Sequence, residues 1–402
     1  MLKVLHVTYY DQYSGSGRAA FRLHSALKNS GAAQSSMLVM QKTSDDPSVT
    51  EFPAAAYRRA VISQRLSARL ISLIHDGNPC AHSLNLFDNP AALDAINGSD
   101  ADLIHLHWPG GEMLSIRQIP RIRKPVIWTL HDTWAFCGAE HYINPLDPGD
   151  TRYKTGYNGS CFDLNSVTWR RKMRHGWNDL PFRFTAPGQW LADRFSDSKL
   201  FAGKACSYIP NMIDTNIFCK MDKAAARASL GLPADKKILL TGAQSNAAPV
   251  KGMHLLRESL QFFADQKDRF LLCSFGSGKM GDSIPLPHRS FGTVTDEKQM
   301  ALLYTAADVL IQPSLIENAS CIIQESLACG TPVAAFRTGG TPGMTGLDTL
   351  AECYDTQELA DKIMWAAFHP DQIRIPEQKP DPLKDYLALY EETVQYGGTH
   401  HG

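Results

Sequence analysis

The sequence predicts an α/β protein with two domains, each built on a parallel sheet. The chain has 402 residues, more than the roughly 100 to 200 residues of one ordinary domain. Short β-branched runs alternate with amphipathic helical runs in two series, a pattern typical of parallel sheets covered by helices. The first series begins at Lys3 and the second at Lys237. We place the domain junction near residue 215, ahead of the charged, Ala-rich stretch 220–229.

The individual strands follow from these runs. In the first series we expect strands at residues 3–9, 36–40, 102–108, 126–131, 182–186 and 206–210. In the second series we expect them at residues 237–242, 269–275, 289–292, 308–313 and 332–336. The predicted domains are therefore residues 1–215 and 216–375. Residues 376–402 should form a helix that packs back on the first domain, followed by a polar tail.

Composition and charge exclude several classes of protein. The net charge of −1 gives no global reason to propose nucleic acid as a partner. No apolar run approaches the roughly 18 residues of a membrane-spanning helix, and the first residues lack the apolar core of a secretory signal. Nine cysteines without a C-x-x-C pair favour reduced thiols. We expect a cytoplasmic protein.

One segment carries a local positive charge. Residues 56–74 combine Arg58, Arg59, Arg65 and Arg69 with apolar residues at roughly helical spacing, which predicts a basic amphipathic helix. Its apolar side either packs on the first domain or docks on an anionic membrane surface. Peripheral contact with the inner face of the cell membrane therefore stays open.

Two carboxylates bracket a predicted helix start in the second series. Glu317 falls on the loop after strand 308–313, and Glu325 falls within the second turn of a helix that should begin near Ser320. At such a site backbone N–H groups and the helix dipole favour an anion. A nucleoside diphosphate fits this arrangement, although two isolated glutamates at this spacing are more often solvated surface residues.

The residues that follow these glutamates carry a family resemblance. With the continuation 326–335 and Gly339–Gly340, the stretch resembles the E-x7-E signature of the family-4 retaining glycosyltransferases. Residues 129–132, 186–191, 209–214 and 250–252 also match, so the resemblance covers nearly the whole chain. It looks closest to enzymes of bacterial exopolysaccharide and O-antigen synthesis, such as the colanic acid transferases.

The resemblance implies a fold and an activity. The fold would be GT-B, with two Rossmann-like domains facing each other across a cleft, the first of them on the acceptor side. The activity would be retaining, metal-independent and cofactor-free transfer of a hexose from a nucleoside diphosphate sugar to a saccharide or lipid-linked saccharide acceptor, in the synthesis of cell-surface polysaccharide or lipopolysaccharide. Glu325 would hold the ribose hydroxyls and Glu317 would lie beside the donor sugar. The implied catalytic residues are His131, Lys251 and Glu317, and the implied donor-binding residues are Gly15, Ser16, Gly17, Gly276, Asn318, Ala319, Ser320 and Glu325.

The chemistry of Lys251 and His131 supports these roles. A lysine in the loop after strand 237–242 could neutralise a leaving diphosphate without a divalent ion. The family's usual arginine six residues earlier is Ser245 here, so Arg257 or Arg289 are candidates to assist. His131 should lie at the carboxyl edge of the first sheet, where a histidine is about as often structural as functional. Its neighbour Asp132 either orients the imidazole or caps the following turn.

The segment 14–18 joins the first strand to a helix expected at residues 19–28. Its small residues would let the backbone approach a phosphate or sugar closely, and a plain tight turn is the alternative. The segment resembles the family's Gly-Gly donor loop, with Ser14 in place of the first glycine and Gly15 matching the second.

No metal site is predicted. Asp100 and Asp102 could be mistaken for a metal-binding pair, but they precede a strand and favour a turn and strand start. Where relatives carry a Cys-rich cluster, only Cys137 and Cys161 remain, too few for zinc.

The alternative function is a catalytically weak sugar-nucleotide-binding or scaffold subunit of a polysaccharide assembly complex. Ser245 favours this alternative, whereas the combination of Glu317, Glu325, Lys251 and His131 favours an enzyme.

Overall fold

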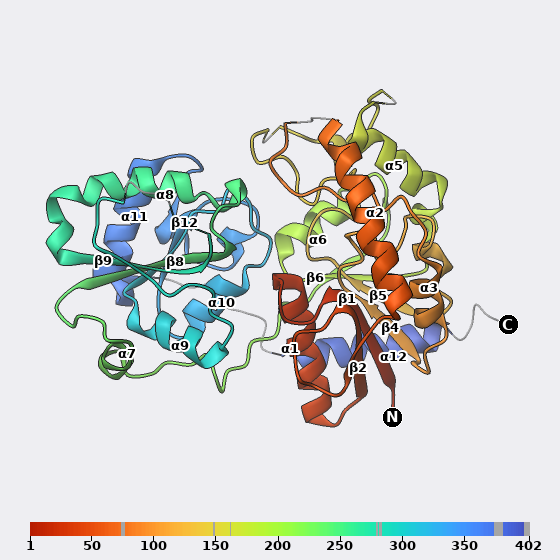
Figure 1. The fold of residues 1–402 in the computed structure, drawn as a ribbon, viewed down its shortest axis with the longest axis horizontal. Helices are drawn as coiled ribbons and strands as arrows, with labels where there is room; N and C mark the ends of the chain where they lie inside the picture. Colours follow the sequence, from red (N-terminus) through yellow and green to blue (C-terminus); the bar gives the residue numbers. More distant parts are fainter. Residues whose placement is uncertain are drawn as a thin grey trace. The chain divides into compact units, whose positions relative to one another are not determined.

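A computed structural model describes residues 1–73, 77–147, 149–160, 162–278, 280, 284–373 and 381–397. The chain forms two compact units (Figure 1). Unit 1 contains Met1–Met212 and Lys379–Gly402, and unit 2 contains Ile213–Gln378. Each unit has its own parallel sheet and its own hydrophobic core.

Unit 1 is built on a seven-stranded sheet in the order β3-β2-β1-β4-β5-β6-β7. All of its pairings are parallel. The strands are β1 Lys3–Tyr10, β2 Gln34–Gln41, β3 Val49–Glu51, β4 Leu103–Leu106, β5 Val126–Thr129, β6 Arg183–Ala186 and β7 Cys206–Tyr208. The strand order reverses between β1 and β4, and open α/β sheets bind their ligands outside the carboxyl ends of the strands at such a switch point.

Helices cover both faces of this sheet. They are α1 Gly15–Ser30, α2 Ala54–Leu73, α3 Pro90–Asn97, α4 Arg152–Thr155, α5 Leu164–Arg174, α6 Gln189–Ser196 and α12 Pro382–Gly397, with 3₁₀ turns η1 Ile119–Arg121 and η2 Trp177–Asp179. Among the described helices, none combines the length with the apolar composition needed to cross a membrane.

The last helix, α12, belongs to unit 1 although it follows unit 2 in the chain (Figure 1). It packs against α1, β4 and β5. Its buried Tyr390 hydroxyl lies 2.7 Å from Nδ1 of His105, and its buried Tyr386 hydroxyl lies 3.2 Å from Oγ1 of Thr129. The helix is therefore tied to the interior of unit 1 by polar as well as apolar contacts.

Unit 2 repeats the same topology with six parallel strands in the order β10-β9-β8-β11-β12-β13. The strands are β8 Lys237–Ser245, β9 Phe270–Ser277, β10 His288–Ser290, β11 Val309–Gln312, β12 Val333–Phe336 and β13 Leu350–Ala351. The helices are α7 Lys223–Leu230, α8 Met253–Leu260, α9 Glu297–Ala306, α10 Cys321–Ala328 and α11 Thr356–Phe368. The 3₁₀ segments are η3 Pro249–Lys251, η4 Gln261–Arg269, η5 Thr341–Gly343, η6 Leu347–Thr349 and η7 Pro370–Gln372. The switch point lies between β8 and β11.

The predicted α/β class with two parallel sheets is confirmed. Every strand expected from the sequence is present within a few residues of its predicted bounds. The edge strands β3 and β13 were not predicted, because runs of 3 and 2 residues are too short to show a periodicity. Residue 74 of the predicted basic helix, Cys161, most of the Pro-rich stretch before α12 and the polar tail from residue 398 lie outside the described residues.

The start of α1 corrects one expectation. The helix begins at Gly15 rather than at Ala19, so Gly15, Ser16 and Gly17 form its first turn and not a loop. The Ser14 side chain caps this turn by accepting a hydrogen bond from the Gly17 amide at 3.0 Å, and such a cap offsets the low helix propensity of glycine.

Candidate functional site

The loop between β11 and α10 holds Glu317 at the switch point of unit 2. The helix begins at Cys321 with Ser320 as its N-cap, so Glu317 lies on the loop and Glu325 within the helix, as predicted. The Ser320 side chain makes no capping hydrogen bond to the described residues. The positive end of the helix dipole therefore lies beside the loop segment 318–320.

Three glycines fix the backbone of this loop. Gly339 has φ 52°, and a Cβ atom there would lie 1.9 Å from the carbonyl oxygen of Glu317. A Cβ atom on Gly340 would lie 1.9 Å from the Asn318 oxygen, and the Gly340 amide donates to the Glu317 oxygen at 2.8 Å. Gly252, with φ 68°, would place a Cβ atom 1.8 Å from the Pro313 oxygen. The loop can take this path only because these neighbours lack side chains.

Lys251 and Glu317 form an ion pair in this setting. The Lys251 Nζ lies 2.6 Å from Oε1 of Glu317, and Nε2 of Gln312 donates to the same oxygen at 3.1 Å. The Lys251 side chain is 29% exposed, whereas that of Glu317 is only 9% exposed. The ammonium is thus the part of the pair that faces solvent, and an anion that enters from solvent would meet Lys251 first.

Glu325 is the most enclosed of the predicted residues. Its side chain is fully buried, and its Oε2 accepts a hydrogen bond from the Tyr304 hydroxyl of α9 at 2.8 Å. Gly276 is the second-last residue of β9 and has φ 100°, and a Cβ atom there would lie 1.7 Å from the Ala243 oxygen of β8. Close packing of these two strands is therefore reason enough for a glycine at this position.

The residues considered as partners of Lys251 have other contacts. Ser245 ends β8. Arg257 donates to the Met280 carbonyl at 2.7 Å, and Arg289 donates to the Gly231 carbonyl at 2.9 Å. In the described part of the chain, neither arginine bonds to Lys251 or Glu317. The charge on Lys251 is therefore not reinforced by a second cation in this arrangement.

In unit 1 His131 lies half-buried two residues after β5, at the carboxyl edge of the sheet. The Asp132 carboxylate accepts hydrogen bonds from the Trp108 indole at 2.9 Å and from the Trp134 amide at 3.0 Å. It also lies 2.6 Å from Nδ1 of His141. Of the two roles considered for Asp132, the structure favours the turn cap, and the imidazole that it orients is that of His141.

His131 ends a chain of histidines that runs beneath the sheet edge. Its Nε2 lies 3.1 Å from Nδ1 of His107, and Nε2 of His107 lies 3.0 Å from Nδ1 of His6. His6 and His107 are fully or almost fully buried. His105 stacks on His107 with ring centroids 4.2 Å apart. Because β1 and β4 are parallel neighbours with His6 opposite His105, these rings share one face of the sheet.

Burial keeps these histidines neutral. It lowers the pKa of His131 to about 4 and that of His105 to about 3, and it lowers the pKa values of His6 and His107 well below their ordinary value of 6.5. At His6, His105 and His107 the neighbouring imidazoles lower the pKa further, because a second positive charge in the cluster would be repelled. At His131 the charge of Asp132 acts against the effect of burial on the pKa. At neutral pH each ring therefore has one donor nitrogen and one acceptor nitrogen.

The environment of His6, at the other end of this chain of histidines, indicates in which direction the hydrogen bonds are donated. Nε2 of His6 is buried with no hydrogen-bond partner among the described residues. If every ring donated toward His6, this nitrogen would be an unpaired buried N–H donor, which is rarer in proteins than an unpaired acceptor. We infer the opposite direction, in which His6 donates to His107 and His107 donates to His131. The proton of His131 then lies on Nδ1, the nitrogen that does not face His107.

His6, His105 and His107 could be considered as metal ligands, since each offers a ligand atom within 4.8 Å of the others. However, both nitrogens of His105 already face hydroxyls at 2.7 Å, those of Tyr390 and Thr129. Both nitrogens of His107 face other histidines. A metal ion would have to displace these hydrogen bonds, so the arrangement fits a hydrogen-bonded network better than a metal centre.

The structure thus brings Lys251 and Glu317 together in unit 2 and buries Glu325 in the helix that follows their loop. In unit 1 it places Gly15–Gly17 after β1, at the switch point, and His131 after β5, at the same carboxyl edge of the sheet. Gly17 packs on β1, because a Cβ atom there would lie 2.5 Å from the Tyr10 oxygen, whereas at Gly15 a Cβ atom would have nothing within 4 Å. Gly15 is therefore the position of this turn that a ligand could approach. Sequence reasoning missed Gln312, Tyr304, His107 and His6.

Most of unit 2 is similar in sequence to a known protein family. Residues 235–367 match the family of group 1 glycosyl transferases. D-inositol 3-phosphate glycosyltransferase 2 of Catenulispora acidiphila is 33% identical over 145 residues, which are 32% of this chain and 34% of that protein. The match spans about a third of the length of such relatives. Their names do not bear out the particular resemblance to exopolysaccharide and O-antigen enzymes.

Solved structures match over the whole chain. A sucrose-phosphate synthase from Thermosynechococcus elongatus has a TM-score of 0.62 at 18% identity, covering 99% of this chain and 98% of that one. Anabaena HepE, solved in complex with UDP-glucose, has a TM-score of 0.58 at 16% identity, covering 98% of this chain and 100% of that one. At these identities the likeness shows the fold, and this chain has the two-domain GT-B architecture.

The glycines around Glu317 generate a first prediction. Gly339→Ala should destabilise unit 2 by roughly 1 to 3 kcal/mol, because it adds a side chain to a left-handed residue that touches the Glu317 carbonyl. Urea unfolding would measure the loss. Gly343→Ala is the matched control in the same segment, since a Cβ atom there meets nothing within 4 Å. Equal stability of the two variants would contradict the enclosure of the loop.

The buried histidines generate a second prediction. Between pH 6.5 and about 4 the unfolded chain binds protons at these histidines that the folded chain does not, so the free energy of unfolding should fall as the pH falls through this window. A pKa lowered from 6.5 to about 4 corresponds to roughly 3 kcal/mol. Tryptophan fluorescence in urea at several pH values would measure this slope. His6→Asn should flatten the slope, whereas the exposed control His254→Asn should not.

Proposed function

We propose that this chain is a glycosyltransferase that moves a sugar from a nucleoside diphosphate donor to a saccharide or lipid-linked saccharide acceptor, with retention and without a metal ion. The observation that carries the proposal is the Lys251–Glu317 pair at the switch point between β8 and β11. Open α/β sheets bind nucleotides at this position. The match of residues 235–367 to group 1 glycosyl transferases supports it.

Unit 2 would bind the donor. Lys251 and the first turn of α10 would face the diphosphate, and positive groups preorganised there would stabilise the charge that develops on the leaving group. The bond between the sugar and the diphosphate would break, the acceptor oxygen would bond to the sugar from the same face, and the acceptor proton would pass to the departing phosphate. Glu325, held by Tyr304, would meet the ribose hydroxyls.

His131 and Glu317 would position the sugar. With its proton on Nδ1 and a pKa lowered to about 4 by burial, His131 is neutral at pH 7. It would therefore act as a hydrogen-bond donor to an oxygen of the donor rather than as a cation. Glu317, paired with Lys251, would accept hydrogen bonds from sugar hydroxyls or stabilise a positively charged transition state.

The exposed face of α2 supports an acceptor at a membrane. Ile62 is 59% exposed, Leu66 42% and Leu70 40%. The helix instead buries small residues against unit 1, namely Ala56, Ala60, Ser63 and Ser67. The side chains of Ile62, Leu66 and Leu70 therefore do not pack on the first domain. Packing of the apolar side on that domain was one of the two interpretations of this segment. Exposed apolar residues beside arginines are typical of helices that lie in the interface of an anionic bilayer.

One observation favours the alternative of a weakly active sugar-nucleotide-binding subunit. With Ser245 at the end of β8, Lys251 is the one cation that the described structure places beside Glu317, and that glutamate already neutralises it. Tight nucleotide binding without donor turnover, with or without acceptors, would identify such a subunit. Nucleotide binding and donor turnover therefore have to be measured separately.

A panel of nucleoside diphosphate sugars gives the third prediction, beginning with UDP-glucose because the structurally similar Anabaena protein was solved with it. Transfer to acceptors, which should include inositol phosphates, and slow hydrolysis of the donor should both persist in a chelator. Lys251→Met should lower turnover by roughly 100- to 1,000-fold, as the loss of a preorganised charge does elsewhere. The exposed Lys267→Met is the control. A chelated enzyme that only magnesium or manganese reactivates would overturn the metal-free mechanism.

Vesicle binding gives the fourth prediction. The chain should bind weakly to vesicles that contain anionic lipid, less at high salt, and little to neutral vesicles, because each basic residue near the surface contributes about 1 kcal/mol. Changing Arg58, Arg59, Arg65 and Arg69 to Gln should abolish this binding and leave donor affinity intact. Co-sedimentation would measure both proteins side by side. Equal binding by the wild type and the variant would exclude α2 as the membrane contact.

A further inference from the structure

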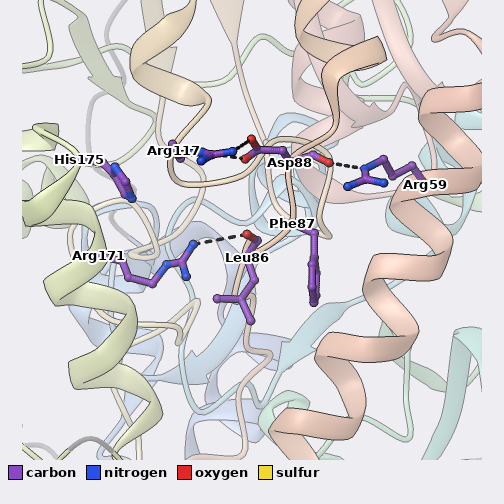
Figure 2. Close-up of a pocket in the computed structure, with 7 residues that line it drawn as sticks. All are labelled: Arg59, Leu86, Phe87, Asp88, Arg117, Arg171 and His175. Carbon is purple, nitrogen blue, oxygen red and sulfur yellow. Dashed lines mark hydrogen bonds and ion pairs between the residues drawn. The ribbon is translucent and has the colours of Figure 1, made fainter.

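A basic pocket in unit 1 shares no lining residue with the Lys251–Glu317 pair or with the chain of histidines. It has a volume of about 420 Å³ and is lined by Arg59 of α2, Arg117 ahead of η1, Arg171 and His175 at the end of α5, and the loop that carries Asp88 (Figure 2). Asp88 is the single acidic residue in this lining. Three arginines therefore share one carboxylate.

The hydrogen bonds of these arginines leave charge uncompensated. Arg117 pairs with Asp88 through two contacts, Nε to Oδ1 at 3.3 Å and a shorter one to Oδ2. Arg59 donates to the Asp88 carbonyl and Arg171 to the Leu86 carbonyl, the latter at 3.4 Å (Figure 2). A carbonyl orients a guanidinium but does not neutralise it. Within the described residues Arg59 and Arg171 make no ion pair, so two positive charges point into the pocket unpaired.

Arg171 also has an unused donor. Its Nε is buried without a hydrogen-bond partner among the described residues, and such a group costs about 1 to 3 kcal/mol, or more when charged. Burial lowers the pKa of Arg171, and the nearby Glu112 acts against this effect. The Glu112 carboxylate is itself engaged by the Ser67 hydroxyl at 2.7 Å and the Phe87 amide at 3.2 Å. It is therefore not the partner of the unused donor.

His175 also lies in a positive electrostatic field. The pKa of His175 is lowered first by burial and then by the charges of Arg171, Arg117 and Arg174. An anion would relieve this repulsion and accept hydrogen bonds from the guanidinium groups that line the pocket. Guanidinium forks match the oxygens of phosphate in pairs, which gives arginine its preference for this anion.

The surroundings indicate what would carry the phosphate. Arg59, Ile62 and Leu66 are spaced by three and four residues, so they lie on one face of α2. The exposed apolar stripe of that helix thus begins beside the pocket, and Leu86 and Phe87 add apolar surface to its lining. A phosphate attached to an apolar chain would match both the arginines of the pocket and the apolar surface beside it. A phosphorylated saccharide would match the arginines alone.

We propose that this pocket binds a phosphate group, presented by a lipid head group or by a phosphorylated saccharide. The site is separate from the Lys251–Glu317 pair and does not depend on sugar transfer. Its occupation would hold an anionic molecule on unit 1 while unit 2 remains able to bind a nucleotide.

The test uses the full chain with two probes. Glycerol 3-phosphate, followed by calorimetry, reports the soluble source, and phosphatidic acid in phosphatidylcholine vesicles reports the lipid source. Arg171→Gln should weaken phosphate binding roughly tenfold or more, the effect of losing hydrogen bonds to a charged group. Arg174→Gln removes the same charge from an exposed position of the same helix and should change binding less than twofold.

The outcomes separate the sources. Binding of both probes, lost in Arg171→Gln, supports a lipid phosphate. Binding of glycerol 3-phosphate alone supports a phosphorylated saccharide and shows that the membrane contact of α2 fails independently. Equal losses in Arg171→Gln and Arg174→Gln, or no binding of either probe by the wild type, would overturn the proposal. Arg59→Gln is a second variant in case Arg171→Gln misfolds, and unchanged UDP binding by each variant confirms that unit 2 is intact.

Discussion

The path of the loop between β11 and α10 depends on a steric constraint, the absence of side chains at three surrounding glycines. Gly252, Gly339 and Gly340 each bring an α-carbon against a carbonyl oxygen of this loop. Because these contacts fix the path of the loop, the Glu317 carboxylate is held where Lys251 and Gln312 can reach it. The charge arrangement at the switch point is thus a consequence of backbone packing, and the ion pair completes a geometry that the glycines already impose.

Local features of the site could be predicted from the sequence. The strands can be identified because β-branched residues cluster in them, and Ser320 marks the start of α10 because its side chain suits an N-cap. The partners of the site residues could not be predicted in the same way. Gln312 meets Glu317 at the end of a buried strand, and Tyr304 reaches Glu325 from another helix. Such contacts depend on tertiary packing, which no local pattern records.

The histidines of unit 1 show the same limit more clearly. His6 and His107 are 101 residues apart in the sequence, and each occupies an ordinary strand or strand end. Only the parallel register of β1 and β4 turns them into neighbours. Once they are neighbours, burial excludes their charged forms and the chain of hydrogen bonds acquires a direction. The predicted start of α1 was wrong for a related reason. The Ser14 cap stabilises a helical turn at glycines that had suggested a loop.

The return of α12 to unit 1 has a consequence for how the protein is made. Synthesis proceeds from the amino terminus, and domains generally fold as units while the chain emerges. Unit 2 is continuous in the sequence, so all of its strands are available before α12 has left the ribosome. Unit 1 must wait for Tyr386 and Tyr390 to cover His105 and Thr129. The unit that is translated first is therefore the one that is completed last, and until then His105 and Thr129 lack the cover that α12 supplies.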